Sequence, residues 1–271
     1  MMRSLWTAAS GMKAQQTNVD TISNNLANVN TVAYKKETNE FKSLLYQTIQ
    51  AKTTSANGDT KPVGAQVGLG VKNAAITSIF QQGNINSTGV DTDFAIEGKG
   101  FFTVQGLDGD TYYTRNGSFN WTTSTGGVML ANSEGLPILD SNGNSIEFAT
   151  DEYDVSAITI DNDGNICYPD ETGNPQTIGV QIGLVQFTNP AGLEKQGNTL
   201  YKATEASGEA AYEDANTLKR SKIRQSALEA SNVQVVDEMV NLIVAQRAYE
   251  LNSKAITTSD SMMQQANQLK N

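Results

Sequence analysis

The sequence predicts an α+β protein in which N- and C-terminal helices pair as a coiled coil and enclose a central antiparallel β-rich domain. Of 23 glycines, only Gly11 falls within residues 1–50 and none within 222–271. All five prolines lie between these two ends. Apolar side chains recur at helical spacing in both ends, whereas the middle carries short apolar runs separated by glycine turns.

These contrasts define three expected domains. Residues 1–40 together with 222–271 form a discontinuous helical assembly domain, 41–70 form a linking helix and an extended arm, and 71–221 form a β-rich outer domain. The two terminal helices must pair with each other or be buried by another copy, because most helical stability comes from packing an apolar face. The sequence therefore indicates an assembling protein rather than a self-contained enzyme.

The first helix is expected over residues 4–29, with Ser4 as its N-cap. Its apolar positions alternate steps of three and four, the spacing of a coiled-coil seam, and Gln15 fills the one polar place. They are Leu5, Ala8, Met12, Val19, Ile22, Leu26 and Val29. The opposite face is rich in Asn and Gln and nearly uncharged, which suits burial against neighbouring subunits. A solvent-exposed polar face is the alternative interpretation.

Residues 41–70 form a transition to the middle of the chain. Phe41, Leu44, Leu45 and Ile49 predict a short second helix, because they also recur at steps of three and four. The polar stretch that follows, 51–64, is typical of a flexible or extended arm.

The middle predicts antiparallel strands in a sandwich or barrel-like domain. The apolar runs cover 94–97, 101–105, 111–115, 128–131, 158–160 and 177–187. Turn signals lie between them at the dipeptides 108–109, 116–117, 142–143 and 163–164, each an Asp or Asn followed by Gly.

The last helix carries a wider apolar face than the first. Its members are Val235, Val236, Met239, Val240, Leu242, Ile243, Gln246, Tyr249 and Ile256, with Met263 continuing the face. Asp237 and Glu238 near its start complement the helix dipole. The two terminal helices are expected to pair, and either a parallel or an antiparallel arrangement is open.

Composition argues against several functions. The net charge of −10 resides in the middle, because residues 51–221 hold 9 basic and 21 acidic side chains. Such an acidic body would repel nucleic acid. Histidine is absent and Cys167 is the only cysteine, so the commonest general base and metal ligand are missing. The first residues lack the apolar core of a secretory signal, so no cleaved signal peptide is expected.

Sequence motifs for ligands and catalysis are weak. The stretch 161–165 (DNDGN) resembles a calcium loop, but its glycine is fourth rather than sixth, so a hairpin turn is the better interpretation. Gly98 and Gly100 lack the strand–helix frame of a phosphate-binding loop. The acidic pair at 151–152 is expected on an acidic body and gives little support to a glycosidase. We therefore expect no catalytic residue, no metal, no cofactor and no small-molecule substrate.

Several motifs resemble those of the bacterial flagellar rod and hook proteins. They lie at residues 4–12 (SLWTAASGM), 23–31 (SNNLANVNT), 98–104 (GKGFFTV), 113–119 (YTRNGSF), 231–233, 239–243 and 246–254 (QRAYELNSK). They occur in the order of that family and span nearly the whole chain. Two features depart from it: Ala33 stands where the family usually has glycine before the aromatic Tyr34, and the acidic run 151–154 has no clear counterpart.

The resemblance implies a structural subunit that polymerises with itself into a helical tube. Its implied partners are other flagellar rod subunits, the hook protein and the flagellar type III export apparatus, and its implied place is the basal body. The length and the segment 41–70 favour a place in the distal part of the rod. The candidate assembly-interface residues are Leu5, Met12, Val19, Ile22, Leu26, Val29, Val236, Met239, Leu242, Ile243, Tyr249 and Ile256.

Two alternatives are open. Within the family, the chain could be a proximal rod subunit or another hook–basal-body paralogue. Outside the family, a ligand-binding β domain carried on a coiled-coil stalk would also combine paired helices with a β-rich middle, and it would form an oligomer of fixed size.

Overall fold

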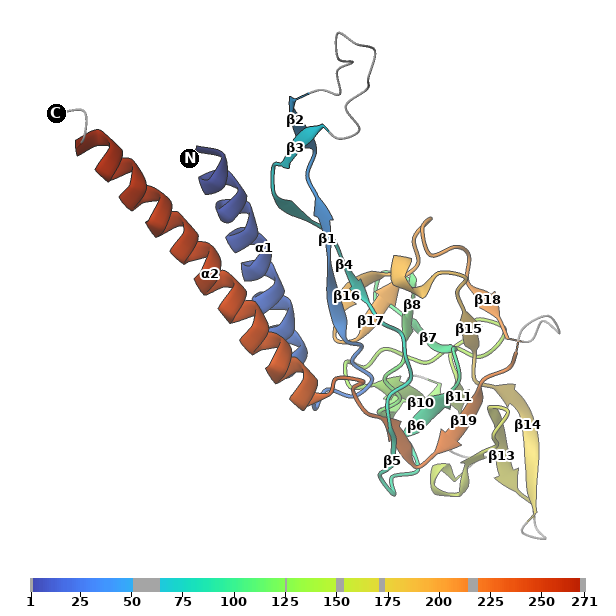
Figure 1. Ribbon diagram of the computed structural model, residues 1–271. Coiled ribbons are helices and arrows are strands. Elements are labelled where there is room, and N and C mark those ends of the chain that lie inside the picture. The colour runs from blue at the N-terminus through green and yellow to red at the C-terminus, as the bar shows by residue number, and fades with distance from the viewer. Residues whose placement is uncertain are drawn as a thin grey trace. The chain divides into compact units, whose positions relative to one another are not determined.

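The computed structural model describes residues 2–50, 64–124, 126–149, 154–170, 174–213 and 219–268. The chain divides into two units. The helical unit comprises Met1–Ala27, Glu37–Ser78 and Gln234–Asn271, and the β unit comprises Asn28–Lys36 and Ile79–Val233. The described parts of each unit are built from different elements: the two long helices and a ribbon of paired strands in one, short strands in the other (Figure 1).

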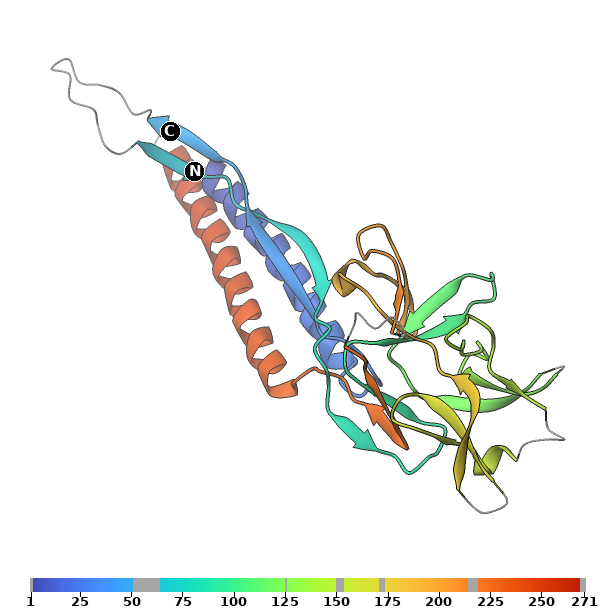
Figure 2. The same cartoon turned by 90° about the vertical axis from the view of Figure 1, so that its right-hand side faces the viewer.

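The helical unit contains α1, Met2–Ala27, and α2, Val235–Gln268. They lie side by side and run in opposite directions, as both views show (Figures 1 and 2). The expected helix 4–29 is therefore shifted: Ser4 lies inside α1 rather than capping it, and Val29 lies in the turns that follow. The expected terminal segment 222–271 begins as strands, and its helix starts at Val235.

The predicted short helix at 41–49 is wrong. Its residues lie in strands β1, Glu37–Ser43, and β2, Tyr46–Gln50. β1 pairs with β4, Val71–Ser78, and β2 pairs with β3, Ala65–Gly68, both antiparallel. Phe41, Leu45 and Ile49 are exposed rather than gathered on one buried face. The segment forms strands rather than a helix because it makes cross-strand hydrogen bonds. The spacing of apolar residues along the sequence does not reveal such bonds. The expected arm 51–64 lies almost wholly outside the described residues.

The β unit is antiparallel, as predicted. Its described strands are β5 Ile85–Ser87, β6 Phe94–Glu97, β7 Phe101–Gln105, β8 Thr111–Thr114, β9 Phe119–Ser124, β10 Gly127–Asn132, β11 Glu147–Phe148, β12 Thr159–Ile160, β13 Asn165–Pro169, β14 Pro175–Gln181, β15 Leu184–Gln186, β16 Glu194–Gly197, β17 Leu200–Lys202, β18 Ala211–Tyr212, β19 Lys222–Gln225 and β20 Ala227–Glu229. Single 3₁₀ turns occur at Val155–Ala157 and Pro190–Gly192. The largest described sheet has the order β16-β17-β8-β7-β15-β18.

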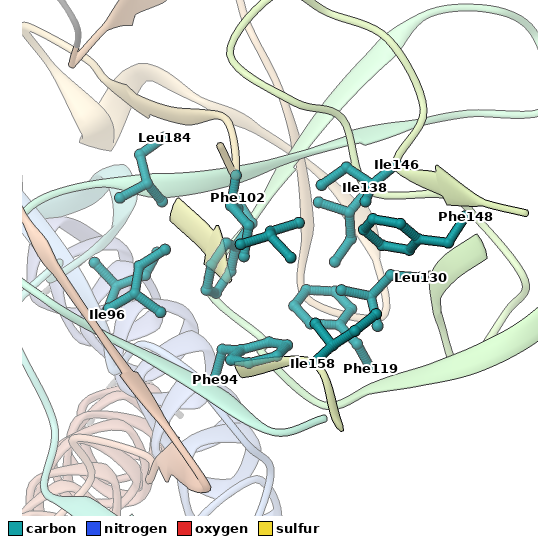
Figure 3. Close-up of a cluster of buried hydrophobic side chains, with 13 residues drawn as sticks. Phe94, Ile96, Phe102, Phe119, Leu130, Ile138, Ile146, Phe148, Ile158 and Leu184 are labelled. Atoms are coloured by element: carbon teal, nitrogen blue, oxygen red, sulfur yellow. The ribbon is translucent and has the colours of Figure 1, made fainter. Parts of the chain in front are cut away.

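Aromatic and β-branched side chains from these strands form the core of the β unit. Phe102 and Phe119 meet edge to face with ring centroids 5.3 Å apart. Around them lie Phe94, Ile96, Leu130, Ile138, Ile146, Phe148, Ile158, Ile166, Ile182, Leu184 and Ile223 (Figure 3). At about 1.5–3 kcal/mol for each large apolar side chain buried, this cluster is the main source of stability in the unit.

The stretch with a calcium-like sequence is a hairpin turn between β12 and β13. The Gly164 amide donates to the Asp161 carbonyl over 2.8 Å, and the Asp161 amide donates to the Asn165 carbonyl over 3.0 Å. Gly164 has a φ of 82°, a left-handed conformation that favours glycine. The turn geometry accounts for these residue types.

Candidate functional site

The contact between α1 and α2 uses small and polar side chains. Ser4 Oγ lies 3.4 Å from Ser259 Oγ. One heptad further along α1, Gly11 faces Asn252, and a Cβ built at Gly11 would lie 3.0 Å from the Asn252 amide nitrogen. Asn252 in turn lies one heptad before Ser259. Glycine at position 11 thus allows the two backbones to approach closely.

The same register continues to the other end of the pair, at Asn25 and Glu238. Asn25 Nδ2 donates to Glu238 Oε2 over 3.0 Å and to the Glu37 carbonyl over 2.8 Å. The Glu37 amide donates back to Asn25 Oδ1 over 2.8 Å. Asn25 and Glu238 are each about 1% exposed. One buried asparagine therefore joins α1, α2 and β1, and we call this set of contacts the Asn25 junction.

The structure separates the candidate assembly residues into three groups. Ile22 is buried; Leu5, Met12, Val19, Leu26, Val29, Leu242 and Ile256 are half-buried; Val236, Met239, Ile243 and Tyr249 are exposed. Val19 and Tyr249 both line a groove of about 370 Å³ between α1 and α2. Val29 lies beyond α1, in the part of the chain assigned to the β unit.

An exposed apolar face runs along the first half of α2. We call it the outer stripe, and it consists of Val236, Met239, Val240, Ile243, Val244 and Leu251. At 100° per residue it lies on the side of α2 opposite Glu238, Ala245 and Asn252, which are buried or face α1. The sequence predicts that the apolar seams of the two helices face each other. On α2 most of the apolar residues instead face away from α1.

Exposed apolar patches of this kind are typical of interaction surfaces, because monomeric proteins seldom expose large contiguous apolar patches. Val236 is 73% exposed and Ile243 is 57% exposed. Burial of each such side chain against a partner contributes about 1.5–3 kcal/mol. The arrangement is suited to protein–protein contact along the length of a helix.

Sequence reasoning missed a buried ion cluster in the β unit. Glu229 Oε1 lies 2.5 Å from Lys35 Nζ, and Glu229 Oε2 lies 3.0 Å from Arg115 Nε. The Gly83 amide also donates to Glu229 Oε1 over 2.8 Å. All three charged side chains are at most 2% exposed. The only sequence signal was a lone acidic residue at the end of an apolar strand.

The two cations of the ion cluster also donate hydrogen bonds to backbone carbonyls. Lys35 Nζ donates to the Gln81 carbonyl over 2.9 Å, and Arg115 donates to the Gly98 carbonyl over 2.8 Å. Burial and the nearby Arg115 charge lower the pKa of Lys35 to about 8, although Glu229 opposes this shift. The cluster ties the connections that enter and leave the unit to its strands, and it exposes no group for chemistry.

Ala33, which stands where the related family usually has glycine, adopts a left-handed conformation. Its φ is 56°, its side chain is fully buried, and its amide donates to the Glu229 carbonyl over 2.8 Å. We expect Ala33→Gly to stabilise the protein by about 0.5–1 kcal/mol, because release of about 1–2 kcal/mol of left-handed strain outweighs the loss of one buried methyl group. Ala33→Val should destabilise it. Urea unfolding measures the free energy of unfolding of both variants. Equal destabilisation by Ala33→Gly and Ala33→Val would contradict the presence of backbone strain at Ala33.

Within the described ranges, no helix is long and apolar enough to cross a membrane. The same part of the chain contains no group of three acidic or cysteine side chains placed to hold a metal ion.

Three family descriptions match the chain in succession. Residues 5–35 match "Flagella basal body rod protein", residues 95–168 match "Flagellar hook protein FlgE/F/G D1 domain", and residues 224–269 match "Flagellar basal body rod FlgEFG protein C-terminal". The first and last matches contain most of α1 and α2, and therefore Asn25, Glu238 and the outer stripe.

Curated relatives match from end to end. The flagellar basal-body rod protein FlgG of Borreliella burgdorferi is 47% identical, with 100% of this chain and 99% of the relative covered. FlgG of Bacillus subtilis is 39% identical with both chains fully covered. The flagellar hook-basal body complex protein FlhP of Bacillus subtilis is 32% identical, with 97% of each chain covered.

Proposed function

This chain belongs to the FlgG family of flagellar basal-body rod proteins, and from that premise we propose that it polymerises into the helical tube of the distal rod through its terminal helices. As a member of this family it is a structural subunit of the flagellar basal body. A contact between unlike surfaces that does not close into a ring generates a helical filament, so one sequence suffices to build a shaft.

The observation that supports this proposal is the exposed outer stripe of α2. We infer that α1 and α2 pair within each subunit as a short antiparallel coiled coil, and that the outer stripe is buried against helices of neighbouring copies. The heptad spacing of the contacts from Ser4 to Asn25 and from Glu238 to Ser259 supports the coiled coil. The candidate residues then divide in role: Ile22 and Leu242 pack within the pair, whereas Val236, Met239 and Ile243 are buried on assembly.

The partners and location follow from this role. The subunit assembles with other rod subunits and with the hook protein, and the β unit forms the outer layer of the tube. We further propose that the chain leaves the cytoplasm through the flagellar type III export apparatus, which requires no cleaved signal peptide. The function is structural rather than enzymatic and uses no cofactor.

Electron microscopy of basal bodies from a strain lacking the gene tests the position in the rod. We expect a rod that stops short and carries no hook, because subunits beyond the missing segment have nothing on which to assemble. A complete rod and hook in that strain would contradict the distal position and favour a paralogue of the FlhP kind.

Replacement of Ile243 by Asp tests the outer stripe itself. Ile243 is 57% exposed, so the monomer should keep its fold, whereas an unpaired carboxylate buried between subunits is costly. We expect the yield of polymer to fall by at least about tenfold, measured by sedimentation and microscopy. Asn241→Asp adds the same charge to another face of α2 and serves as the matched control. Polymerisation of Ile243→Asp at the wild-type yield would contradict the proposal.

A further inference from the structure

A groove of about 890 Å³ in the β unit gathers basic side chains on an otherwise acidic body. The connection before β5, the turn between β6 and β7, and the segment leading into β19 line it. Its lining includes Phe80, Glu97, Lys99, Lys219, Arg220 and Lys222, and we call the site the basic groove. All of them belong to one unit.

The fold fixes this row of cations in place. Ser221 is buried, whereas Arg220 and Lys222 on either side of it are exposed, as the alternation along an extended chain requires. Glu213 accepts hydrogen bonds from the Ser221 amide over 2.6 Å and from the Ser221 hydroxyl over 2.8 Å. The Gly100 amide, next to Lys99, donates to Ser221 Oγ over 3.0 Å. The backbone beneath the cations is therefore anchored on both sides of the groove.

Three other cations of the β unit have a carboxylate partner. Lys35 and Arg115 contact Glu229 in the ion cluster, and Lys202 lies 2.6 Å from Asp110. By contrast, no ion pair joins Lys99, Lys219 or Lys222 to any carboxylate in the described part of the chain.

Glu97, the cross-strand neighbour of Lys222, is the one acidic residue in the lining, against four basic residues. The groove therefore carries a net positive charge within a region whose overall charge is strongly negative. Such a local reversal of sign favours an anionic partner.

We propose that the basic groove binds the acidic run of a second copy of this chain, residues 151–154, whose sequence is Asp-Glu-Tyr-Asp. Residues 151–153 lie outside the described part of the structure, and the chemistry of their side chains is what suits the groove. Three carboxylates within four residues match the cluster of cations. The tyrosine between them provides a ring that can pack on Phe80, which is half-buried in the lining of the groove.

This inference rests on the proposed polymer, because it places the contact between copies. It also addresses a difficulty of that polymer: bodies with a large excess of acidic residues repel one another at close range. Contact between the positively charged basic groove of one copy and the acidic run of the next would offset part of this repulsion. It would also fix the relative orientation of the two copies.

Binding of a labelled peptide tests the contact without polymerisation. A fluorescent peptide of residues 148–156 is titrated with the full-length monomer at low salt, and its anisotropy is recorded. We expect binding that weakens as salt is raised, and a loss of at least about tenfold in affinity for the variant Lys99→Glu/Lys222→Glu.

Two controls match this experiment. Arg224→Glu reverses an exposed charge on the same strand outside the groove and should leave binding unchanged. A peptide with Asn and Gln in place of the three acidic residues should not bind. The inference is overturned by absence of binding, by binding that Lys99→Glu/Lys222→Glu leaves intact, or by equal binding of the neutral peptide.

A charge exchange distinguishes the groove from the polymer as a whole. Lys99→Glu/Lys222→Glu should slow polymerisation, and adding Asp151→Lys/Glu152→Lys to the same chain should restore it. Polymerisation at the wild-type rate in every variant would overturn the groove contact and leave the rod function standing. Failure of the wild-type chain to polymerise would contradict the rod function, whereas peptide binding would still report on the groove.

Discussion

Replacement of Glu229 by Gln is expected to lower the free energy of unfolding of the β unit by about 3–5 kcal/mol. The variant keeps the shape of the side chain and its acceptor for the Gly83 amide, but it leaves Lys35 and Arg115 as two buried cations without a carboxylate. Breaking a buried ion pair is far more costly than replacing it, because the remaining charge has lost its hydration.

Thermal and urea unfolding followed by Trp121 fluorescence measure this effect. Trp121 packs on Phe148 with ring centroids 5.9 Å apart, so its emission reports on the core of the β unit. A Trp6→Phe background removes the other tryptophan, which is 73% exposed on α1. Glu205→Gln removes an exposed carboxylate and is the matched control. A Glu229→Gln protein within about 0.5 kcal/mol of the wild type would contradict a stabilising role for the cluster.

The same variant has a predicted pH dependence. The pKa of Lys35 is lowered from its ordinary 10.5 to about 8 in the folded protein, so the unfolded chain binds more protons between these values. By linkage, the contribution of Lys35 to stability is least favourable below about pH 8 and improves as the pH rises towards 10.5. Glu229 raises the pKa of Lys35, so its replacement lowers that pKa further below 8. The difference between wild type and Glu229→Gln should therefore shrink as the pH rises towards 8 and stay constant above it, where Lys35 is uncharged in both folded proteins.

A second variant in the ion cluster separates charge from packing. Lys35→Met in the Glu229→Gln chain removes one of the two uncompensated cations and keeps most of the side-chain volume. It should recover part of the lost stability, whereas a defect in packing alone would make the double variant worse than the single one.

Asn25→Ala is expected to open the helix pair and to cost about 3 kcal/mol. The substitution removes three hydrogen bonds from a site that is 1% exposed, and one of their partners is the buried carboxylate of Glu238. It also removes the contact that holds the start of β1 against both helices. The variant should therefore lose protection of α1 and α2 together and should polymerise poorly.

Hydrogen exchange of the full-length monomer measures the opening directly. Amides of α1 and α2 near the Asn25 junction should exchange at least about tenfold faster in Asn25→Ala, since a loss of 1.4 kcal/mol already changes an opening equilibrium tenfold. Gln16→Ala removes an exposed amide from the same helix and should have no such effect. Unchanged protection in Asn25→Ala would show that the junction does not hold the pair.

Asn25→Asp tests the chemistry of the same junction. It preserves the acceptor for the Glu37 amide but places a second carboxylate where Asn25 now lies 3.0 Å from Glu238. Two carboxylates at such a short distance repel each other at neutral pH. We therefore expect fast exchange at pH 7 and partial recovery when acid protonates the pair.

The helices were predictable from the sequence because their signals are local. Steps of three and four residues, the absence of proline and the presence of a single glycine, Gly11, placed α1 and α2 to within a few residues. The same steps misled at 41–49, because four apolar residues in a short segment also satisfy two paired strands. That segment forms strands because it is hydrogen-bonded to β3 and β4, which lie farther along the chain. A pattern read within the segment itself cannot show these pairings.

Which face of α2 meets α1 was not predictable from apolarity. The inner face carries Glu238, Ala245 and Asn252, and the outer stripe carries most of the large apolar side chains. A rule that places apolar residues in the nearest interface within the chain therefore fails for α2, and the proposed burial of the outer stripe by other copies would explain why. The ion cluster was unpredictable for a different reason, since Lys35, Arg115 and Glu229 are far apart in the sequence and resemble surface charges.

The antiparallel pairing of α1 with α2 has a consequence for the order of events during synthesis. The ribosome completes α1 before the whole β unit and completes α2 after it, so α1 has no partner in its own chain until translation has passed the body. A chain released early keeps an intact α1 but lacks both the Glu238 contact and the outer stripe. Under the proposed assembly the pairing would act as a check on completeness, because only a subunit translated through α2 has the outer stripe.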